Sequence, residues 1–83
     1  MQDTSLQAYY GIVDKLPAKR KAVFEIIRIS GPLCNESIAL RLGWAINRVT
    51  GRVKELRDAG LVEDAGTVKR NGYNVHTWRI KYV

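Results

Sequence analysis

Polar and cationic side chains flank the central glycine, Gly51, in the stretch WAINRVTGRVKELRDAG, residues 44–60. If this stretch is a helix, Gly51 lies opposite its apolar side and costs about 1 kcal/mol relative to Ala. Glycine is useful there because it lets another molecule approach the backbone closely. An amide, a hydroxyl and three cations beside it suit phosphate oxygens and base edges in a DNA major groove. These side chains are Asn47, Arg48, Thr50, Arg52 and Lys54.

The apolar side of the same stretch defines how the helix must sit. At helical spacing, Val49, Val53 and Leu56 fall together and predict a buried stripe, flanked by Ala45 and Ile46. Two acidic residues, Glu55 and Asp58, are expected to point outward in the C-terminal half. That half usually leaves the groove when a recognition helix binds DNA.

Side chains suited to catalysis are scarce. The chain has one histidine, His76, and one cysteine, Cys34, so nucleophile–base pairs are poorly supplied and no zinc pattern is present. Glu63 and Asp64 are adjacent on an expected strand and face opposite sides. Cys34 has no resolving partner, which makes it an ordinary small residue. We therefore predict no enzyme, metal, cofactor or small-molecule ligand.

The formal net charge is +6, and the surplus sits on separated segments. Residues 17–31 contribute +3, residues 44–60 contribute +2 and residues 67–83 contribute +4. A basic domain of this size suggests an anionic partner, a nucleic acid or a membrane surface. The chain has no apolar run long enough to cross a membrane and no basic-then-apolar signal peptide.

Three helical segments are expected ahead of residue 44. The first, residues 3–16, carries Leu6, Tyr9, Tyr10, Val13 and Leu16 at helical spacing. Pro17 is expected at the first position of the second helix, which Gly31 and Pro32 stop. The inner stripe of that helix is expected to be Val23, Ile26, Ile27 and Ser30. Phe24 lies off this stripe, where it would pack against the first helix or face a partner chain.

The third helix and its successor have the outline of a helix-turn-helix. NESIALRLG, residues 35–43, is expected to begin with Asn35 as N-cap and to end at Gly43. Its inner residues are Ile38, Ala39 and Leu42.

After Gly60 the apolar period changes from helical to alternating. LVEDA reads as a short strand, and TVKRNGYNVHTWRIKYV reads as a hairpin around Asn71-Gly72. Trp78, Ile80 and Tyr82 share one face of the return strand, or Trp78 and Ile80 alone do so if the pairing ends early.

Three stretches resemble the winged helix-turn-helix family. NESIALRLGW resembles the second helix and turn, and INRVTGRVKELRDAGLVED resembles the recognition helix running through LRDAGLV into the first wing strand. VKRNGYNVHTWRI resembles the wing and its return strand. With PAKRKAVFEIIRIS the likeness covers residues 17–81, and its look is that of small phage and bacterial regulators. Cys34 departs from the family, which usually has Ser or Thr at that position.

The resemblance implies an α+β fold, with a three-helix core, a two- or three-stranded sheet and no catalysis. Residues 17–83 form the winged-helix domain and residues 1–16 an N-terminal helical extension. Residues 45–58 would lie in the major groove, and the wing at residues 66–77 would lie on the minor groove or backbone. Carried over by position, the DNA-binding residues are Ala45, Ile46, Asn47, Arg48, Thr50, Gly51, Arg52, Lys54, Lys69, Arg70, Asn71 and Tyr73.

The expected function is sequence-specific binding of double-stranded DNA by a small transcriptional regulator or a phage-type DNA-binding factor. Such a protein would work in the bacterial cytoplasm, on the nucleoid, or in the host cytoplasm if phage-encoded. A homodimer through Leu6, Tyr9, Tyr10 and Val13 would double its small footprint. A winged-helix adaptor that binds protein is the alternative. RNA binding is disfavoured because no aromatic row stands on an exposed sheet face.

Overall fold

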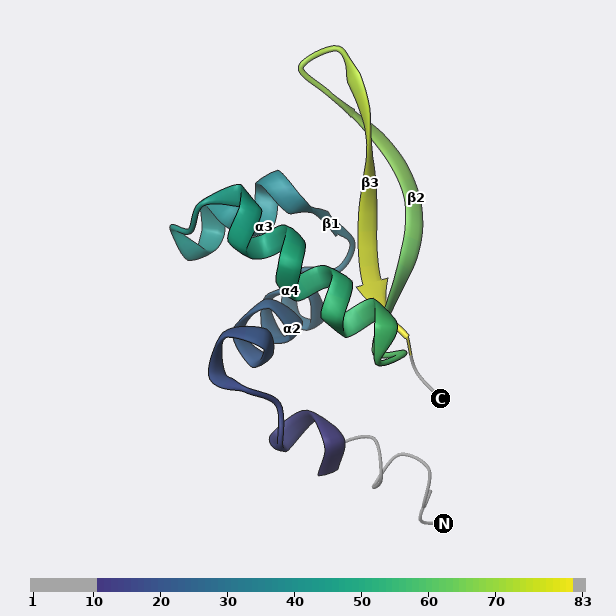
Figure 1. Ribbon diagram of the computed structural model, residues 1–83. Coiled ribbons are helices and arrows are strands. Elements are labelled where there is room, and N and C mark those ends of the chain that lie inside the picture. Colours follow the sequence, from purple (N-terminus) through teal and green to yellow (C-terminus); the bar gives the residue numbers. More distant parts are fainter. Residues whose placement is uncertain (1–10, 82–83) are drawn as a thin grey trace.

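A computed structural model describes residues 11–81 of the chain, in which helices are followed by an antiparallel sheet (Figure 1). Residues 11–14 are helical and lead into the remaining elements. These are α2 (Ala18–Ser30), β1 (Leu33–Cys34), α3 (Asn35–Leu42), α4 (Ile46–Asp58), β2 (Val62–Arg70) and β3 (Tyr73–Ile80). The α+β class expected from the sequence is confirmed.

Helix α2 begins one residue later than expected. Pro17 is its N-cap, and the Pro17 carbonyl accepts a hydrogen bond from the Lys21 amide at 2.8 Å. Gly31, at φ 79°, ends the helix as expected. The predicted inner stripe was partly wrong, because Phe24 is buried while Ile26 is only half-buried. Since α2 packs against both α4 and β3, its buried arc is turned toward Phe24.

The turn between α3 and α4 closes at a glycine in the left-handed region. Gly43 has φ 70° and ψ 31°, and the next amide, that of Trp44, donates to the Ala39 carbonyl at 3.0 Å. This is the hydrogen bond of a Schellman-type helix end. Trp44 is half-buried against the core, so the turn is held from beneath as well as by its backbone.

The sheet has the order β1-β3-β2, and both pairings are antiparallel. The short strand read at LVEDA and the first arm of the hairpin are continuous, because β2 is one strand with a one-residue bulge. Asp64 pairs with Trp78 and Thr67 with His76, so β2 carries the extra residue. Gly66 lies in the bulge at φ 97°, and its amide donates to the Asp64 side chain at 2.7 Å.

The hairpin turn forms where the Asn-Gly pair predicted it. Asn71 and Gly72 have φ values of 53° and 82°, the positive angles that a two-residue type I′ turn requires. Arg70 and Tyr73 are the flanking pair. Beyond the bulge, this hairpin extends past the helices (Figure 1).

One core joins all of these elements. Val13 is buried in this core, so its side chain is not presented to a second chain. Leu6, Tyr9, Tyr10 and Tyr82, which the sequence also assigned to packing, lie outside the described residues. Trp78 and Ile80 fill the space between sheet and helices, as expected. The helices contribute Val23, Phe24, Ile27, Ile38, Ala39, Val49, Val53 and Leu56.

Between residues 11 and 81, no helix is both long and apolar enough to cross a membrane. The same residues hold no cluster of His, Cys, Asp and Glu side chains that could bind a metal ion.

Candidate nucleic-acid interface

The packing of α4 determines which of its side chains reach solvent. Val49, Val53 and Leu56 are buried, as the sequence predicted, and they hold the helix against α2, α3 and β2. Gly51 lies away from this stripe, and a Cβ placed on it would meet no atom within 4 Å. The glycine is therefore not required by packing inside the chain. The open space over it is available to another molecule.

Around Gly51, the predicted residues of α4 form an exposed face of mixed chemistry. Asn47, Arg48 and Thr50 are exposed, and 76% of the Lys54 side chain is accessible, although its ammonium lies 3.4 Å from Asp58. Within residues 11–81 no ion pair is formed by Arg48. The face thus offers an uncompensated guanidinium, a primary amide and a hydroxyl around a bare stretch of backbone.

The predicted flanking role of Ala45 and Ile46 in the buried stripe was wrong. Ala45 is the N-cap, with ψ 143°, so a helical wheel does not describe its direction. Ile46 begins the helix and is 52% exposed. Both residues lie at the exposed start of α4, where the resemblance had placed DNA contacts.

Asn35 has a role that the sequence did not reveal. It was expected to cap α3, but Cys34 is the N-cap and Asn35 is the first helical residue. The Asn35 side chain accepts from the Trp78 indole N–H at 2.7 Å and donates to the Thr50 hydroxyl at 3.5 Å. Thr50 in turn donates to the Ile46 carbonyl at 3.0 Å. Asn35 therefore links the sheet core to the exposed face of α4.

Cys34 is buried where β1 meets α3. Burial raises the pKa of its thiol, but hydrogen bonds with Ser37 and the charge of Arg70 outweigh this and leave the pKa lower than usual. The Sγ and Ser37 Oγ atoms are 3.3 Å apart. The thiol thus contacts the first turn of α3 through the Ser37 side chain, but it makes no capping hydrogen bond to the helix backbone.

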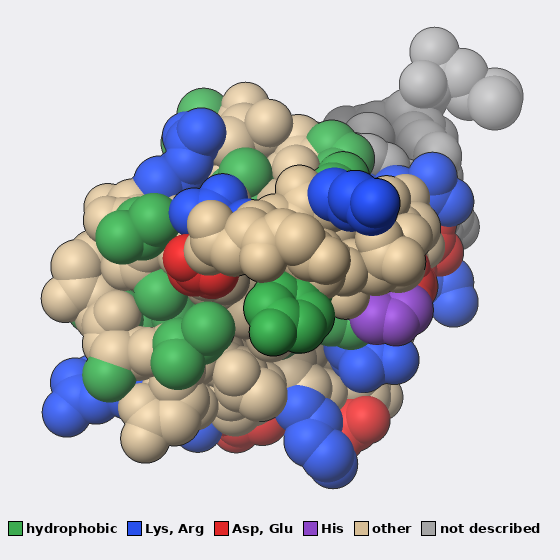
Figure 2. Space-filling model, turned by 90° about the horizontal axis from the view of Figure 1, so that it is seen from above, with side chains coloured by type: hydrophobic (Ala, Val, Ile, Leu, Met, Phe, Trp, Pro, Cys, Tyr) green, Lys and Arg blue, Asp and Glu red, His purple; other side chains and the backbone are tan. Residues whose placement is uncertain are grey.

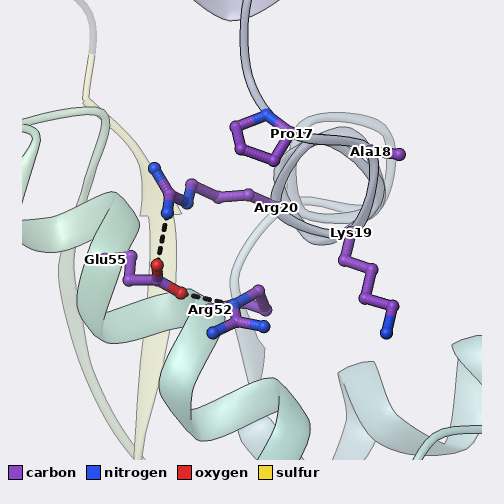
Figure 3. Close-up of a pocket in the computed structure, with 6 residues that line it drawn as sticks. All are labelled: Pro17, Ala18, Lys19, Arg20, Arg52 and Glu55. Carbon is purple, nitrogen blue, oxygen red and sulfur yellow. Dashed lines mark hydrogen bonds and ion pairs between the residues drawn. The ribbon is translucent and has the colours of Figure 1, made fainter.

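Arg52 is turned away from Gly51 toward α2, where it shares a carboxylate with Arg20. Glu55 accepts hydrogen bonds from both guanidinium groups, one on each oxygen (Figure 3). The expectation that Glu55 points outward was wrong, because its carboxylate lies between the two helices. The hydrogen bond from Arg52, with the nearby charges of both arginines, lowers the pKa of Glu55.

At the hairpin tip, the four predicted residues divide into two groups. Lys69, Asn71 and Tyr73 are exposed, Tyr73 to 74%. Arg70 folds back onto the start of α3, with its Nε 3.1 Å from Glu36 and a terminal nitrogen 3.3 Å from the Ser37 hydroxyl. Three of the four side chains are therefore available to a partner, and the fourth ties the hairpin to α3.

His76 on β3 and Asp64 on β2 form a side-chain pair, in which the His76 Nδ1 atom lies 2.6 Å from the Asp64 Oδ2 atom. The Gly66 amide, and then His76, lower the pKa of Asp64. Behind this pair, the Arg57 guanidinium lies 4.6 Å over the Trp78 ring. These contacts fix the base of the hairpin beside α4.

Seen from the hairpin end, the surface is not uniformly basic. In Figure 2, Lys and Arg side chains lie at several separate places, with hydrophobic and uncharged surface between them. Charge alone therefore does not define the interface. It is defined by the residues that stand open on α4 and at the hairpin tip.

No protein-family model matches this chain, and a search of curated proteins finds no match either.

Proposed function

We propose that this chain is a winged helix-turn-helix protein that binds double-stranded DNA and performs no chemistry on it. Helix α4 enters the major groove, and the β2–β3 hairpin acts as the wing on the minor groove or backbone. The order of three helices and a β-hairpin supports this assignment. A small transcriptional regulator or a phage-type DNA-binding factor is the role that fits such a domain.

One observation carries the proposal: the open backbone at Gly51. Apart from its chain neighbours and the adjoining helix backbone, a Cβ there would meet no atom within 4 Å, and Asn47 and Arg48 stand beside it with hydrogen-bonding groups exposed. A bare helix backbone flanked by donors for phosphates and base edges suits a helix that lies close to DNA. Lys69, Asn71 and Tyr73 supply a second contact region at the tip of the hairpin.

The test is fluorescence anisotropy with mixed-sequence duplex DNA, over salt from about 50 to 200 mM. We expect binding that weakens steeply with salt and is lost in Gly51→Glu, which puts a carboxylate where the duplex must approach. Gly11→Glu is the control, because Gly11 is also helical and a Cβ added there also meets open space, although Gly11 is exposed and Gly51 is half-buried. No wild-type binding at low salt, or equal loss in both variants, would contradict the proposal.

The second candidate is a protein-binding adaptor, which the exposed apolar side chains favour. Leu40 is 69% exposed, and Ile46 is exposed at the start of α4. An adaptor would show no affinity for duplex DNA in the same assay at any salt concentration.

A further inference from the structure

Three cations and one carboxylate, drawn from two helices, lie where the start of α2 meets α4. Lys19 and Arg20 come from the first turn of α2, and Arg52 and Glu55 come from α4 (Figure 3). Together with Pro17 and Ala18 they line an open hollow. The only acidic side chain lining this hollow is Glu55, so its charge is positive by two.

The cations of this hollow are not fully used by the chain itself. The Oε2 atom of Glu55 pairs with Arg20 and its Oε1 atom pairs with Arg52. One negative charge therefore balances only one of the two guanidinium charges. The Nε of Arg20 is buried and has no hydrogen-bond partner in the described chain. The Lys19 ammonium makes no ion pair within residues 11–81. The excess positive charge of the hollow favours an additional anion.

The backbone beside the hollow adds to this charge. Helix α2 has no acidic residue in its first turn and no side-chain cap. Its free N–H groups therefore keep their partial positive charge toward the hollow. Lys19 and Arg20 occupy a turn where cations are normally unfavourable, which local helix stability does not explain.

We infer that this hollow is a second DNA contact, which binds a backbone phosphate through Lys19, Arg20 and Arg52. The inference rests on the proposed function, because the phosphate belongs to the duplex on α4. Arg52 lies one helical turn after Arg48, so the hollow continues the exposed side of α4 toward α2. Glu55 holds the two arginines in place and competes with the phosphate for them.

The first test compares variants that each lose one positive charge. The salt dependence of their duplex binding is measured by fluorescence anisotropy. Each phosphate contact contributes about 0.9 to the slope of log K against log salt. We expect Lys19→Gln and Arg20→Gln each to make this negative slope shallower by up to that amount. Lys81→Gln removes the same charge from an exposed lysine after β3 and should leave the slope unchanged. Lys19 makes no ion pair within residues 11–81, so its variant tests the site even if Arg20→Gln unfolds.

The second test removes the competing carboxylate. Glu55→Gln should raise affinity for duplex DNA roughly threefold or more at low salt, because both arginines are released to the phosphate. Glu63→Gln changes the net charge equally but frees Arg79, 2.7 Å away at the base of the hairpin, and should have a smaller effect. Thermal unfolding of each variant shows that it is folded.

The outcomes separate the two hypotheses. If wild-type protein binds no duplex, both the proposed function and this inference are overturned. If binding depends on Gly51 while Lys19→Gln and Arg20→Gln behave as Lys81→Gln does, only the phosphate site is overturned. An equal gain from Glu55→Gln and Glu63→Gln would also overturn it.

Discussion

Helix α4 and the β2–β3 hairpin carry similar side chains on very different supports. The exposed residues of α4 stand directly over Val49 and Val53, which are buried in the core. The outer half of the hairpin has no such backing, since residues 67–74 are exposed on both faces except for Arg70. A helix fixed by its buried side presents polar groups in one geometry, whereas the outer hairpin is tied to α3 through the Arg70 side chain and not through a buried face. Proteins that read bases need the first property more than the second.

The two regions also differ in how their arginines are used. Arg48 has no ion pair in the described chain, whereas Arg70 is bound to Glu36 and Ser37. Both are basic residues at positions assigned to DNA from the sequence. A cation is available to an interface only where no internal partner holds it, as at Arg48 and not at Arg70.

The largest effect expected is on Arg48. Arg48→Ala should weaken duplex binding by about 1–3 kcal/mol, roughly fivefold to more than a hundredfold, and should relax sequence preference at one position. Anisotropy with a selected duplex and its single-base variants measures both. Arg70→Ala is the matched hairpin variant and should change binding little. Equal losses from the two would break the comparison.

Gly51→Ala adds one methyl group, whose effects on folding stability and on DNA affinity are expected to have opposite signs. An added Cβ meets nothing, so the variant should gain up to about 1 kcal/mol of unfolding free energy from helix propensity. Urea unfolding measures this gain. Affinity for DNA should fall in the same variant, because the methyl group stands between backbone and duplex. A variant with both higher stability and unchanged affinity would show that no close approach occurs at Gly51.

A smaller effect is expected from Lys69, which is exposed at the hairpin tip. Lys69→Ala should weaken binding by roughly 1 kcal/mol or less, uniformly across sequences. The negative slope of log K against log salt should become shallower by about 1. The salt series described for wild type tests this. A sequence-dependent loss would mean that the hairpin reads bases, and the contrast with α4 would disappear.

The smallest effect concerns pH. Because the folded pKa of Glu55 is lowered, its contribution to stability is present above the unfolded pKa of about 4.3 and is lost as pH falls through the folded value. Wild type should therefore lose its stability advantage over Glu55→Gln on acidification below about pH 4. Thermal melts of both proteins between pH 3 and 7 check this. A difference that does not vary with pH would contradict it.

The sequence predicted those features that depend on neighbouring residues. The stripe of Val49, Val53 and Leu56 follows from helical period, and the turn at Asn71-Gly72 follows from the positive φ that few residues adopt.

Features that depend on distant partners were missed. Arg20 meets Glu55 from 35 positions away, and Asn35 meets Trp78 across 43. The second contact also explains the error at the start of α3, because the Asn35 side chain is occupied by the indole and cannot cap the helix. No local pattern reports such pairings.

The bulge at Gly66 divides the hairpin in a way that affects the entropy of binding. On the helix side of the bulge, Val62, Trp78 and Ile80 are fixed when the core forms, so their order is acquired during folding. On the far side, the exposed side chains of Val68, Lys69 and Tyr73 keep rotational freedom in the free protein. These side chains lose that rotational freedom only when a partner binds. A partner of the tip must therefore supply the free energy that immobilises it, whereas a partner of α4 meets a surface already ordered.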